Sequence, residues 1–390
     1  MIALFFVNAV TAQWVPQNSG TVSNLTSVYF TNSIIGYVVG TGGTILKTYN
    51  SGASWDSLVS GTSNDLGSVH FPVTDTGYAV SAYYWGTIMK TVNAGISWTL
   101  LVSSSAAYYS VYFTSANTGY VTEGSYMGSG NIMKTTNGGN TWIFTDVGWP
   151  LGINFPNSVT GYSVGVDGQI WSHGVINKTS DGGLTWVNIL SVAGKSLKSV
   201  YFIDSEIGYV VGVGGTVLKT TDGGTNWINL TSGTTNDLSS VSFPEANTGY
   251  IVGTGGTILK TANGGLTWAN QVSGTSLNLA SVYFTDANTG YVVGDSGTIL
   301  KTTNGGVGLN EIPDDPSHLK IYPNPSSTNI TIETNTKGNL SILNLSGSEL
   351  LQQTITEHST TIDISTLPAG VYFVKLIEKG RVLVGKIIKE

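Results

Sequence analysis

The chain has 390 residues, including 51 Gly and 10 Trp, and no Cys. Only 10% of its residues are charged, against about 25% in an average soluble domain, while 40% are apolar, so the chain is rich in turns yet apolar enough to build a core. The net charge of −7, with Arg381 the single Arg, argues against nucleic acid as a partner, and the lack of Cys excludes disulfides, thiolate metal sites and Cys nucleophiles.

Residues 1–12 are interpreted as a secretory signal peptide. An apolar stretch from Ile2 to Val10 leads into Val10-Thr11-Ala12, a small-residue pattern that signal peptidase accepts, so Gln13 would be the first mature residue. No basic residue precedes the apolar stretch, which indicates a truncated start, and a buried strand is the alternative interpretation. No run of about 18 apolar residues occurs, so no transmembrane segment is expected.

A repeat fills residues 13–306. Phe recurs at positions 30, 71, 113, 155, 202, 243 and 284, and a Tyr follows each one seven residues later. A Lys stands at positions 47, 90, 134, 178, 219, 260 and 301, and a Trp follows the first six of these by eight residues. Each copy reads as four short strands separated by Gly- and Asn-rich turns. About 40 residues per four-stranded sheet is the size of a propeller blade, so the sequence predicts an all-β, seven-bladed β-propeller.

The seventh copy lacks its Trp, and the start of the chain supplies a match. The segment from Trp14 to Thr21 resembles the segment from Trp268 to Thr275, which opens the fourth strand of the sixth copy. We therefore expect the N-terminal strand to complete the last blade, because closing the ring leaves no open face between blades.

The turns between the third and fourth strands resemble the Asp-box, or bacterial neuraminidase repeat, of the form Ser/Thr-x-Asp/Asn-x-Gly-x-Thr-Trp. The Asx and Trp positions of the six complete copies are Asn50 and Trp55, Asn93 and Trp98, Asn137 and Trp142, Asp181 and Trp186, Asp222 and Trp227, and Asn263 and Trp268. An Asx side chain accepts turn N–H groups, Gly allows positive φ and Trp buries a large ring, so a structural role is predicted. A cation or sugar site in each box is the alternative.

The repeated Lys has two interpretations as well. Its stem could cover apolar surface between strands, which is common for Lys on a strand. Alternatively, the equivalent ammonium groups could form a ring that attracts an acidic partner.

The longer pattern Gly-x-Gly-Gly-Thr-Ile-Leu-Lys-Thr-x-Asx-Gly-Gly-x-Thr-Trp occurs, with small departures, at residues 40–55, 212–227 and 253–268. It resembles the photosystem II assembly and stability factor family of seven-bladed propellers. The resemblance implies the fold and a role in membrane-protein assembly through an arginine-rich patch, whereas this sequence has no Arg before Arg381.

The sequence does not favour a catalytic function. Asp-box sialidases hold the substrate carboxylate with three Arg residues, and a propeller without Arg lacks that planar bidentate clamp. A glycosidase needs only two carboxyl groups, for which Glu123, Asp146 and Asp167 are candidates. His70 replaces the Tyr of a Ser-Val-Tyr-Phe strand and is interpreted as a packed histidine. The four His residues show no metal-ligand spacing, so neither a metal site nor a cofactor is expected.

Loop lengths place the candidate binding surface. The spacing from the repeat Tyr to the repeat Lys runs 10, 12, 14, 16, 10, 10 and 10 residues through the seven copies. In an up-and-down blade this turn and the crossing to the next blade emerge on one face, opposite the Asp-boxes. Exposed aromatic residues on loops suit binding of a protein or a glycan. The candidate binding residues are Tyr83, Tyr84, Trp85, Tyr126, Met127, Trp149, Trp171 and His173. The alternative is that these rings fold inward and fill a seam or the central channel.

After a linker at residues 307–317 the repeat stops. Strands are expected at 319–322, 329–333, 339–343, 349–355, 361–364, 371–377 and 382–388, which indicates a small immunoglobulin-like β-sandwich at residues 318–390. The motifs Ile321-Tyr322-Pro323-Asn324-Pro325, Leu345-Ser346-Gly347, Leu367-Pro368-Ala369-Gly370-Val371-Tyr372 and Lys386-Ile387-Ile388-Lys389 resemble the type A C-terminal sorting domain of the type IX secretion system. The resemblance implies recognition of residues 318–390 by that machinery, passage through the periplasm, and release or attachment at the outer cell surface.

The sequence as a whole predicts an exported, monomeric, non-catalytic recognition protein. Its propeller would bind an unidentified protein or glycan through the aromatic loops of the second to fourth copies. A glycoside-acting enzyme and a membrane-protein assembly factor remain the alternatives.

Overall fold

The computed structural model describes residues 14–82, 85–124, 130–168, 173–306, 319–334, 337–344, 348–378 and 381–390. The chain divides into two units, Met1–Gly308 and Leu309–Glu390. The signal peptide expected at residues 1–12 and the linker expected at 307–317 lie outside the described residues. The all-β class is confirmed, because the described strands of both units form antiparallel sheets.

Each copy of the repeat forms one four-stranded antiparallel sheet, and the described residues 14–306 contain seven of them. Blade 1 comprises β2 (Leu25–Phe30), β3 (Gly36–Gly40), β4 (Ile45–Thr48) and β5 (Asp56–Leu58); blade 2 comprises β6 (Leu66–His70), β7 (Gly77–Ser81), β8 (Thr87–Thr91) and β9 (Thr99–Ser103); blade 3 comprises β10 (Ala107–Phe113), β11 (Gly119–Gly124), β12 (Gly130–Thr135) and β13 (Ile143–Asp146). Blade 4 comprises β14 (Trp149–Asn154), β15 (Gly161–Val166), β16 (His173–Thr179) and β17 (Val187–Ala193); blade 5 comprises β18 (Leu197–Phe202), β19 (Gly208–Gly212), β20 (Thr216–Thr220) and β21 (Ile228–Leu230); blade 6 comprises β22 (Leu238–Ser242), β23 (Gly249–Gly253), β24 (Ile258–Thr261) and β25 (Ala269–Asn270).

Blade 7 joins the two ends of the repeat region. It comprises β26 (Leu279–Phe284), β27 (Gly290–Gly294), β28 (Ile299–Thr302) and, as its outer strand, β1 (Val15–Gln17). β1 pairs with β28, with Val15 opposite Lys301, and the ring of Trp14 is fully buried. The predicted closure by the N-terminal strand is therefore confirmed. Pro16 is tolerated there because an outer strand has one free edge.

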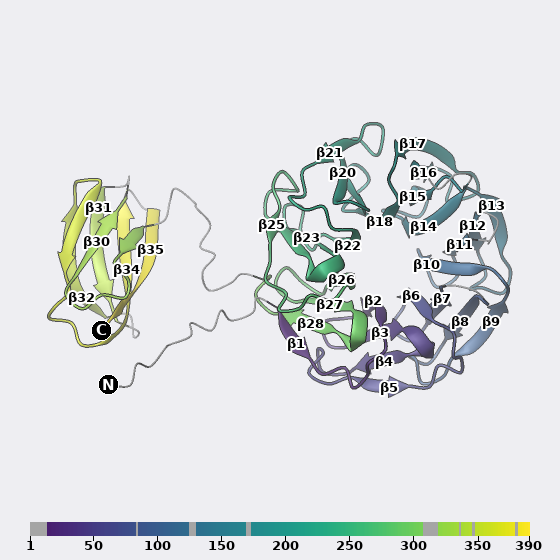
Figure 1. Ribbon diagram of the computed structural model, residues 1–390, viewed down its shortest axis with the longest axis horizontal. Helices are drawn as coiled ribbons and strands as arrows, with labels where there is room; N and C mark the ends of the chain where they lie inside the picture. Colours follow the sequence, from purple (N-terminus) through teal and green to yellow (C-terminus); the bar gives the residue numbers. More distant parts are fainter. Residues whose placement is uncertain are drawn as a thin grey trace. The chain divides into compact units, whose positions relative to one another are not determined.

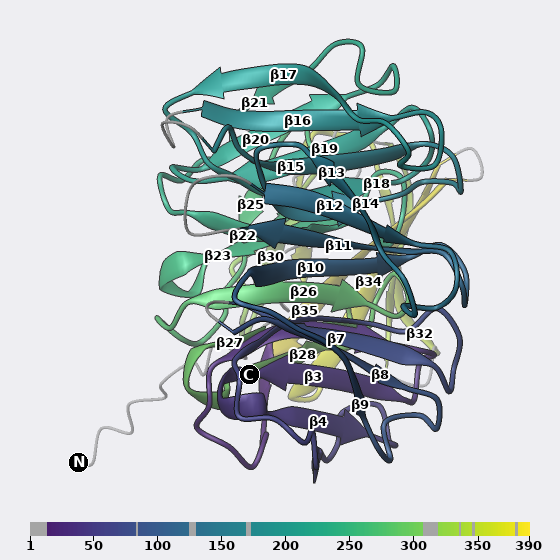
Figure 2. The ribbon, with the colours of Figure 1, turned by 90° about the vertical axis from the view of Figure 1, so that its right-hand side faces the viewer.

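The blades form a ring (Figure 1). The first strand of each blade contacts the first strands of both neighbouring blades, and β2 of blade 1 also meets β26 of blade 7. Seen from the side, the blade strands run from one face of the ring to the other (Figure 2). Short 3-10 turns follow the second strand in three blades: η1 (Thr41–Gly43), η2 (Thr254–Gly256) and η3 (Asp295–Gly297).

Aromatic rings fill the space between neighbouring blades. Tyr209 of blade 5 stacks on Phe243 of blade 6 with ring centroids 3.9 Å apart, and Trp268 meets the same Phe edge-on at 6.0 Å. The Gly before each repeat Tyr makes room for the Phe of its own blade. At Gly249, for example, an added Cβ would lie 2.4 Å from the Phe243 ring. The constant spacing from Phe to Tyr thus serves packing between blades.

The second unit is a β-sandwich. One sheet has the order β29 (Lys320–Tyr322), β30 (Asn329–Glu333) and β33 (Ser359–Asp363), and the other has the order β32 (Glu349–Ile355), β31 (Gly338–Leu343), β34 (Gly370–Glu378) and β35 (Arg381–Lys389). Their facing side chains, among them Ile330, Leu340, Ile362 and Leu376, form one buried core. The strands expected from the sequence agree with these bounds within two residues. Across the described parts of both units, no helix is long and apolar enough to span a bilayer.

Candidate functional site

The turns of the ring divide into two faces. On the Asp-box face, each box lies beside the turn between the first two strands of its own blade, as Gly223 N–H donates to Glu206 O at 3.0 Å. On the crossing face, the turn between the second and third strands meets the crossing into the next blade, as Gly215 N–H donates to Asn236 O at 2.8 Å. The turns of variable length all belong to the crossing face.

The polar groups of an Asp-box bond within the box. In blade 5, Asn226 N–H donates to Asp222 Oδ1 at 2.8 Å, and Thr220 Oγ1 donates to the same oxygen at 2.9 Å. The Gly224 N–H in turn donates to Thr220 Oγ1 at 2.9 Å. The hydrogen bonds that the Asp222 carboxylate accepts hold its pKa below its usual value, and the bond from the Asn226 backbone N–H is the largest cause. The carboxylate is therefore committed to closing its own turn.

Each repeat Tyr fastens its blade to the Asp-box of the next blade. Tyr209 OH donates to Gly264 O at 2.8 Å, and Lys219 Nζ donates to the same oxygen at 2.7 Å. The equivalent Tyr-to-carbonyl bonds are Tyr37 to Ala94, Tyr78 to Gly138, Tyr120 to Gly182, Tyr162 to Gly223, Tyr250 to Gly305 and Tyr291 to Ser51. We call each of these contacts a Tyr–box clasp. Lys47, Lys90, Lys178 and Lys301 join their clasps in the same way, so these ammonium groups serve contacts between blades.

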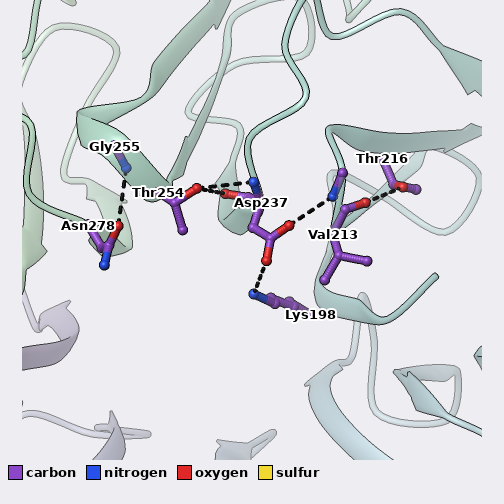
Figure 3. A network of polar contacts seen from close by, with 8 residues as sticks. Lys198, Val213, Thr216, Asp237, Thr254, Gly255 and Asn278 are labelled. Carbon is purple, nitrogen blue, oxygen red and sulfur yellow. Dashed lines mark hydrogen bonds and ion pairs between the residues drawn. The ribbon is translucent and has the colours of Figure 1, made fainter.

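A second kind of contact fastens the crossing face (Figure 3). Asp237, at the entry to blade 6, accepts the Gly214 N–H of the blade 5 turn at 2.9 Å and pairs with Lys198 Nζ at 3.3 Å. The Gly214 hydrogen bond first, and then the Lys198 ammonium, hold the pKa of Asp237 below its usual value, opposed by partial burial. The equivalent turn-to-Asx bonds are Gly42 to Asp65, Gly255 to Asn278 and Ser296 to Asn24. The turns of blades 1, 5, 6 and 7 are thus closed by the same hydrogen bond to an Asx side chain.

The turns of blades 2, 3 and 4 are longer than those of the other blades. In blade 2, Gly86 N–H donates to Ala106 O at 2.8 Å, the same backbone bond that Gly215 makes to Asn236 O. Ala107 stands at the position of the acceptor Asp237 and offers no side-chain oxygen. In blades 3 and 4 the longer turn extends the hairpin, with Gly124 opposite Gly130 and Val166 opposite Gly174. We call this part of the crossing face the variable arc. The described residues that characterise it are Trp85, Glu123, Asn131, Trp149, Asp167 and His173.

Trp85 projects from the variable arc into solvent. Its side chain is 69% exposed, and its backbone has φ of 67°, which is unfavourable for a bulky residue. Asn64 Nδ2 donates to the Trp85 carbonyl at 2.7 Å and holds the turn. The same turn position has positive φ in four other blades, at Gly42, Gly214, Gly255 and Ser296, so the turn imposes this conformation and, of these five blades, only blade 2 places a bulky residue there.

Glu123 of blade 3 is held by a neighbouring amide. Asn131 Nδ2 donates to Glu123 Oε2 at 2.7 Å. The strand register places Asn131 opposite Glu123 on one side and opposite Asp146 on the other. Asp146 accepts the Gly148 N–H at 3.2 Å, which commits one of its oxygens to the crossing into blade 4.

Blade 4 contributes a paired carboxylate and imidazole. His173 Nδ1 lies 3.1 Å from Asp167 Oδ2, and the other carboxylate oxygen, Oδ1, is buried with no hydrogen-bond partner. The His173 side chain is 39% exposed. An added Cβ on Gly148 would lie 3.4 Å from Asp167, while one on Gly130 would lie 2.4 Å from Gly148 O. The crossing therefore brings the hairpins of blades 3 and 4 together.

The candidate binding residues do not all share one environment. Trp149 is buried, with only 9% of its surface exposed, and its ring lies 6.1 Å from that of Tyr109. It fills the seam between blades 3 and 4, which was the alternative for these rings. Trp85 and His173 reach the surface. Tyr83, Tyr84, Tyr126, Met127 and Trp171 lie outside the described residues.

Sequence reasoning missed Asn64 and Asn131, which hold Trp85 and Glu123 in place. No motif marks either residue, because their roles depend on turn geometry and strand register.

Of the nine Lys in residues 14–306, only Lys195 and Lys198 lie outside the repeat position, and this region has no Arg. Within the described ranges, no group of three or more His, Asp or Glu side chains is placed to hold a metal ion.

The protein belongs to the class of all-β proteins, with a β-propeller and a C-terminal β-sandwich in one chain. Residues 320–390 match the family model described as the secretion system C-terminal sorting domain. Residues 189–274 and 229–320 match the model described as photosynthesis system II assembly factor YCF48. Both resemblances inferred from the sequence are confirmed, and the sorting domain indicates export through the type IX secretion system to the outside of the cell.

Solved structures similar to this chain are propellers. YCF48 bound to D1 peptide has a TM-score of 0.62 at 18% identity, covering 75% of this chain and 95% of its own. YCF48 from Cyanidioschyzon merolae also has a TM-score of 0.62 at 18% identity, covering 74% of this chain and 98% of its own. The GH74 enzyme of Niastella koreensis has a TM-score of 0.60 at 14% identity, covering 97% of this chain and 74% of its own. The comparison with curated proteins finds no match. These likenesses show the fold.

Proposed function

We propose that the exported propeller is a non-catalytic recognition module that binds a glycan or a protein through the variable arc. The observation that carries the proposal is the asymmetry of the crossing face. Four blades close their turns with the same bond to an Asx side chain, whereas blades 2 to 4 have longer turns, and that of blade 2 exposes Trp85 at the positive-φ position where the other four blades have Gly or Ser. Packing of the ring does not require this departure, since the other blades pack without it.

The chemistry of the variable arc suits a neutral sugar best. An exposed indole offers a flat apolar surface for a sugar ring, and the Glu123–Asn131 and Asp167–His173 pairs offer hydrogen-bonding groups for hydroxyls. The arc contains no Lys or Arg among its characterising residues, so a polyanion is disfavoured. The likeness to a YCF48 propeller with a bound peptide supports a peptide as the competing ligand.

Binding of the full chain to a glycan array and to a peptide array tests this proposal. We expect Trp85→Ala to weaken binding roughly tenfold or more, because exposed aromatic anchors dominate such interfaces. Leu266→Ala is the matched control, since Leu266 is 70% exposed on the Asp-box face of blade 6. Equal binding by Trp85→Ala and the wild-type chain would remove the variable arc as the site.

Glycoside hydrolysis is the second candidate function. The likeness to a GH74 enzyme and the half-buried Glu123 and paired Asp167 favour it. Retaining and inverting glycosidases need two carboxyl groups flanking the scissile bond. Release of reducing sugar that is abolished by Glu123→Gln or Asp167→Asn, with glycan binding retained, would favour the enzyme over the recognition module.

A further inference from the structure

The two outward faces of the C-terminal sandwich differ in polarity. On the smaller sheet, the outward side chains carry polar groups that bond to one another, and even the exposed Tyr322 donates its hydroxyl to Glu333. Lys320 Nζ lies 3.1 Å from Glu333 Oε2, and Thr331 Oγ1 lies 3.4 Å from Thr361 Oγ1. This is the ordinary pattern of an antiparallel sheet with one face in the core and one face in water.

The outward face of the β34–β35 hairpin breaks that pattern. Phe373 is 37% exposed, Ile377 39%, Val384 51% and Ile388 36%. On the same two strands, the inward residues Tyr372, Val374, Leu376, Leu383 and Ile387 are already buried in the core. Both sides of the hairpin are therefore apolar, which is typical of a sheet that is covered on both faces.

Two lysines are interleaved with these apolar side chains. The register places Phe373 opposite Lys386 and Lys375 opposite Val384. We call Phe373, Lys375, Ile377, Val384, Lys386 and Ile388 the hairpin face. No carboxylate is among these residues, so a complementary surface would combine apolar side chains with carboxylates.

We propose that the hairpin face is the surface by which the sorting domain docks onto a protein of the export machinery, one that presents apolar side chains bordered by carboxylates. The export machinery must recognise a sorting domain, and among the described residues the outward face of the smaller sheet has only Tyr322 as an exposed large aromatic or aliphatic side chain, against four on the hairpin face. Burial of exposed Phe and Val side chains supplies the affinity, and the two ammonium groups set the orientation. This inference rests on the sorting domain and is independent of what the propeller binds.

Export of the full chain from a host with a type IX secretion system tests the proposal. The variant Phe373→Ser with Val384→Ser is expected to lower the exported fraction at least tenfold, and Lys375→Glu with Lys386→Glu at least threefold. The matched control is Thr331→Ala with Thr361→Ala on the other outward face, which is expected to export within twofold of the wild type. Thermal unfolding of each purified chain checks that the sandwich is folded.

Wild-type export by a folded Phe373→Ser, Val384→Ser chain would overturn the proposal. If that variant does not fold, the charge variant decides, because its substitutions leave the apolar packing untouched. Dimerisation of the purified wild-type chain in the ultracentrifuge that is lost in these variants, with export unchanged, would also overturn it, since the occupant would then be a second copy.

Discussion

At the residue scale, the side chains that recur in every blade hold neighbouring blades together, whereas His70 occurs in one blade only. The Tyr and Lys of the clasps share one buried backbone oxygen in the neighbouring blade, as Tyr209 and Lys219 do at Gly264. Burial lowers the pKa of Lys219 and raises that of Tyr209 to about 12, so the Tyr209 hydroxyl keeps its proton at neutral pH. The contacts between neighbouring blades therefore explain why this Tyr and this Lys recur in every blade.

The shared acceptor predicts coupling between the two donors. Tyr209→Phe should lower the free energy of unfolding by about 1 kcal/mol, because Gly264 O keeps the bond from Lys219. Lys219→Met should cost a similar amount. The double variant should cost more than the sum, since it leaves a buried carbonyl without a donor. Urea unfolding of the four proteins measures the coupling, and strict additivity would show that the clasp does not share its acceptor.

His70 is an exception within the ring of central side chains. Its ring lies between Tyr29 and Tyr112, with centroids 4.8 and 4.9 Å away, and its Nδ1 is buried without a partner. The Tyr residues at the equivalent positions donate across blades, as Tyr29 OH does to Phe71 O at 2.9 Å. The interpretation of His70 as a packed histidine agrees with these contacts.

Burial lowers the pKa of His70 to about 4, which makes stability depend on pH. Because the unfolded chain binds this proton more readily, the contribution of His70 is complete above pH ~6.5 and is lost as the pH falls toward 4. His70→Tyr should therefore stabilise the propeller by about 2 kcal/mol more at pH 4.5 than at pH 8. His70→Phe, which cannot titrate, is the control and should show the same pH-dependent gain. Urea unfolding at both pH values checks this, and parallel pH profiles for wild type and variants would contradict it.

At the scale of elements, the outer strand of blade 7 has more consequence than its length suggests. β1 has only three residues, yet it pairs with β28 and carries Trp14 into the position that other blades fill with the Trp of the box. Trp14 meets Phe284 edge-on at 5.9 Å, the geometry that Trp268 has with Phe243. β1 and Trp14 therefore supply the fourth strand and the Trp that the seventh copy lacks.

Deletion of residues 13–21 should destabilise the whole ring. Removing the Trp14 ring alone should cost about 3–5 kcal/mol, because a large buried side chain leaves a cavity. Val15→Thr is the control and should change little, since Val15 is 54% exposed. Differential scanning calorimetry measures both, and an unchanged melting temperature in the deletion variant would refute closure by β1.

At the scale of the whole molecule, the chain is two units with separate cores. The sandwich core is drawn from residues 319–387, and the cores between blades are drawn from the propeller alone. The sorting domain can therefore direct export while the propeller carries the recognition role that we propose for it.

Ending the chain after Gly308 tests this division. The melting temperature of the propeller and its binding through the variable arc should be unchanged, because no core residue of the ring is removed. Export should be lost with the sorting domain. A propeller that unfolds at a lower temperature after truncation would show that the two units depend on each other.

The sequence by itself determined the blade and its closure, because both follow from periodic spacing. A Phe, a Tyr seven residues later and a Trp in each box recur at constant spacing because every copy makes the same contacts with its neighbours. Trp14 matches the Trp that the seventh copy lacks, and so indicates which segment supplies the missing strand. The strands of the sandwich follow in the same way from alternating apolar residues. Local pattern suffices wherever the same contact is made many times.

Only the tertiary structure decided the contacts that occur once. Trp149 and Trp85 are both loop aromatics in the sequence, yet one fills a seam over Gly124 and the other stands in solvent. Asn131 meets Glu123 through strand register, and the hairpin face is defined by which side of the sheet the core occupies. Which way a loop side chain turns depends on space left by residues distant in the chain, and no local pattern encodes that space.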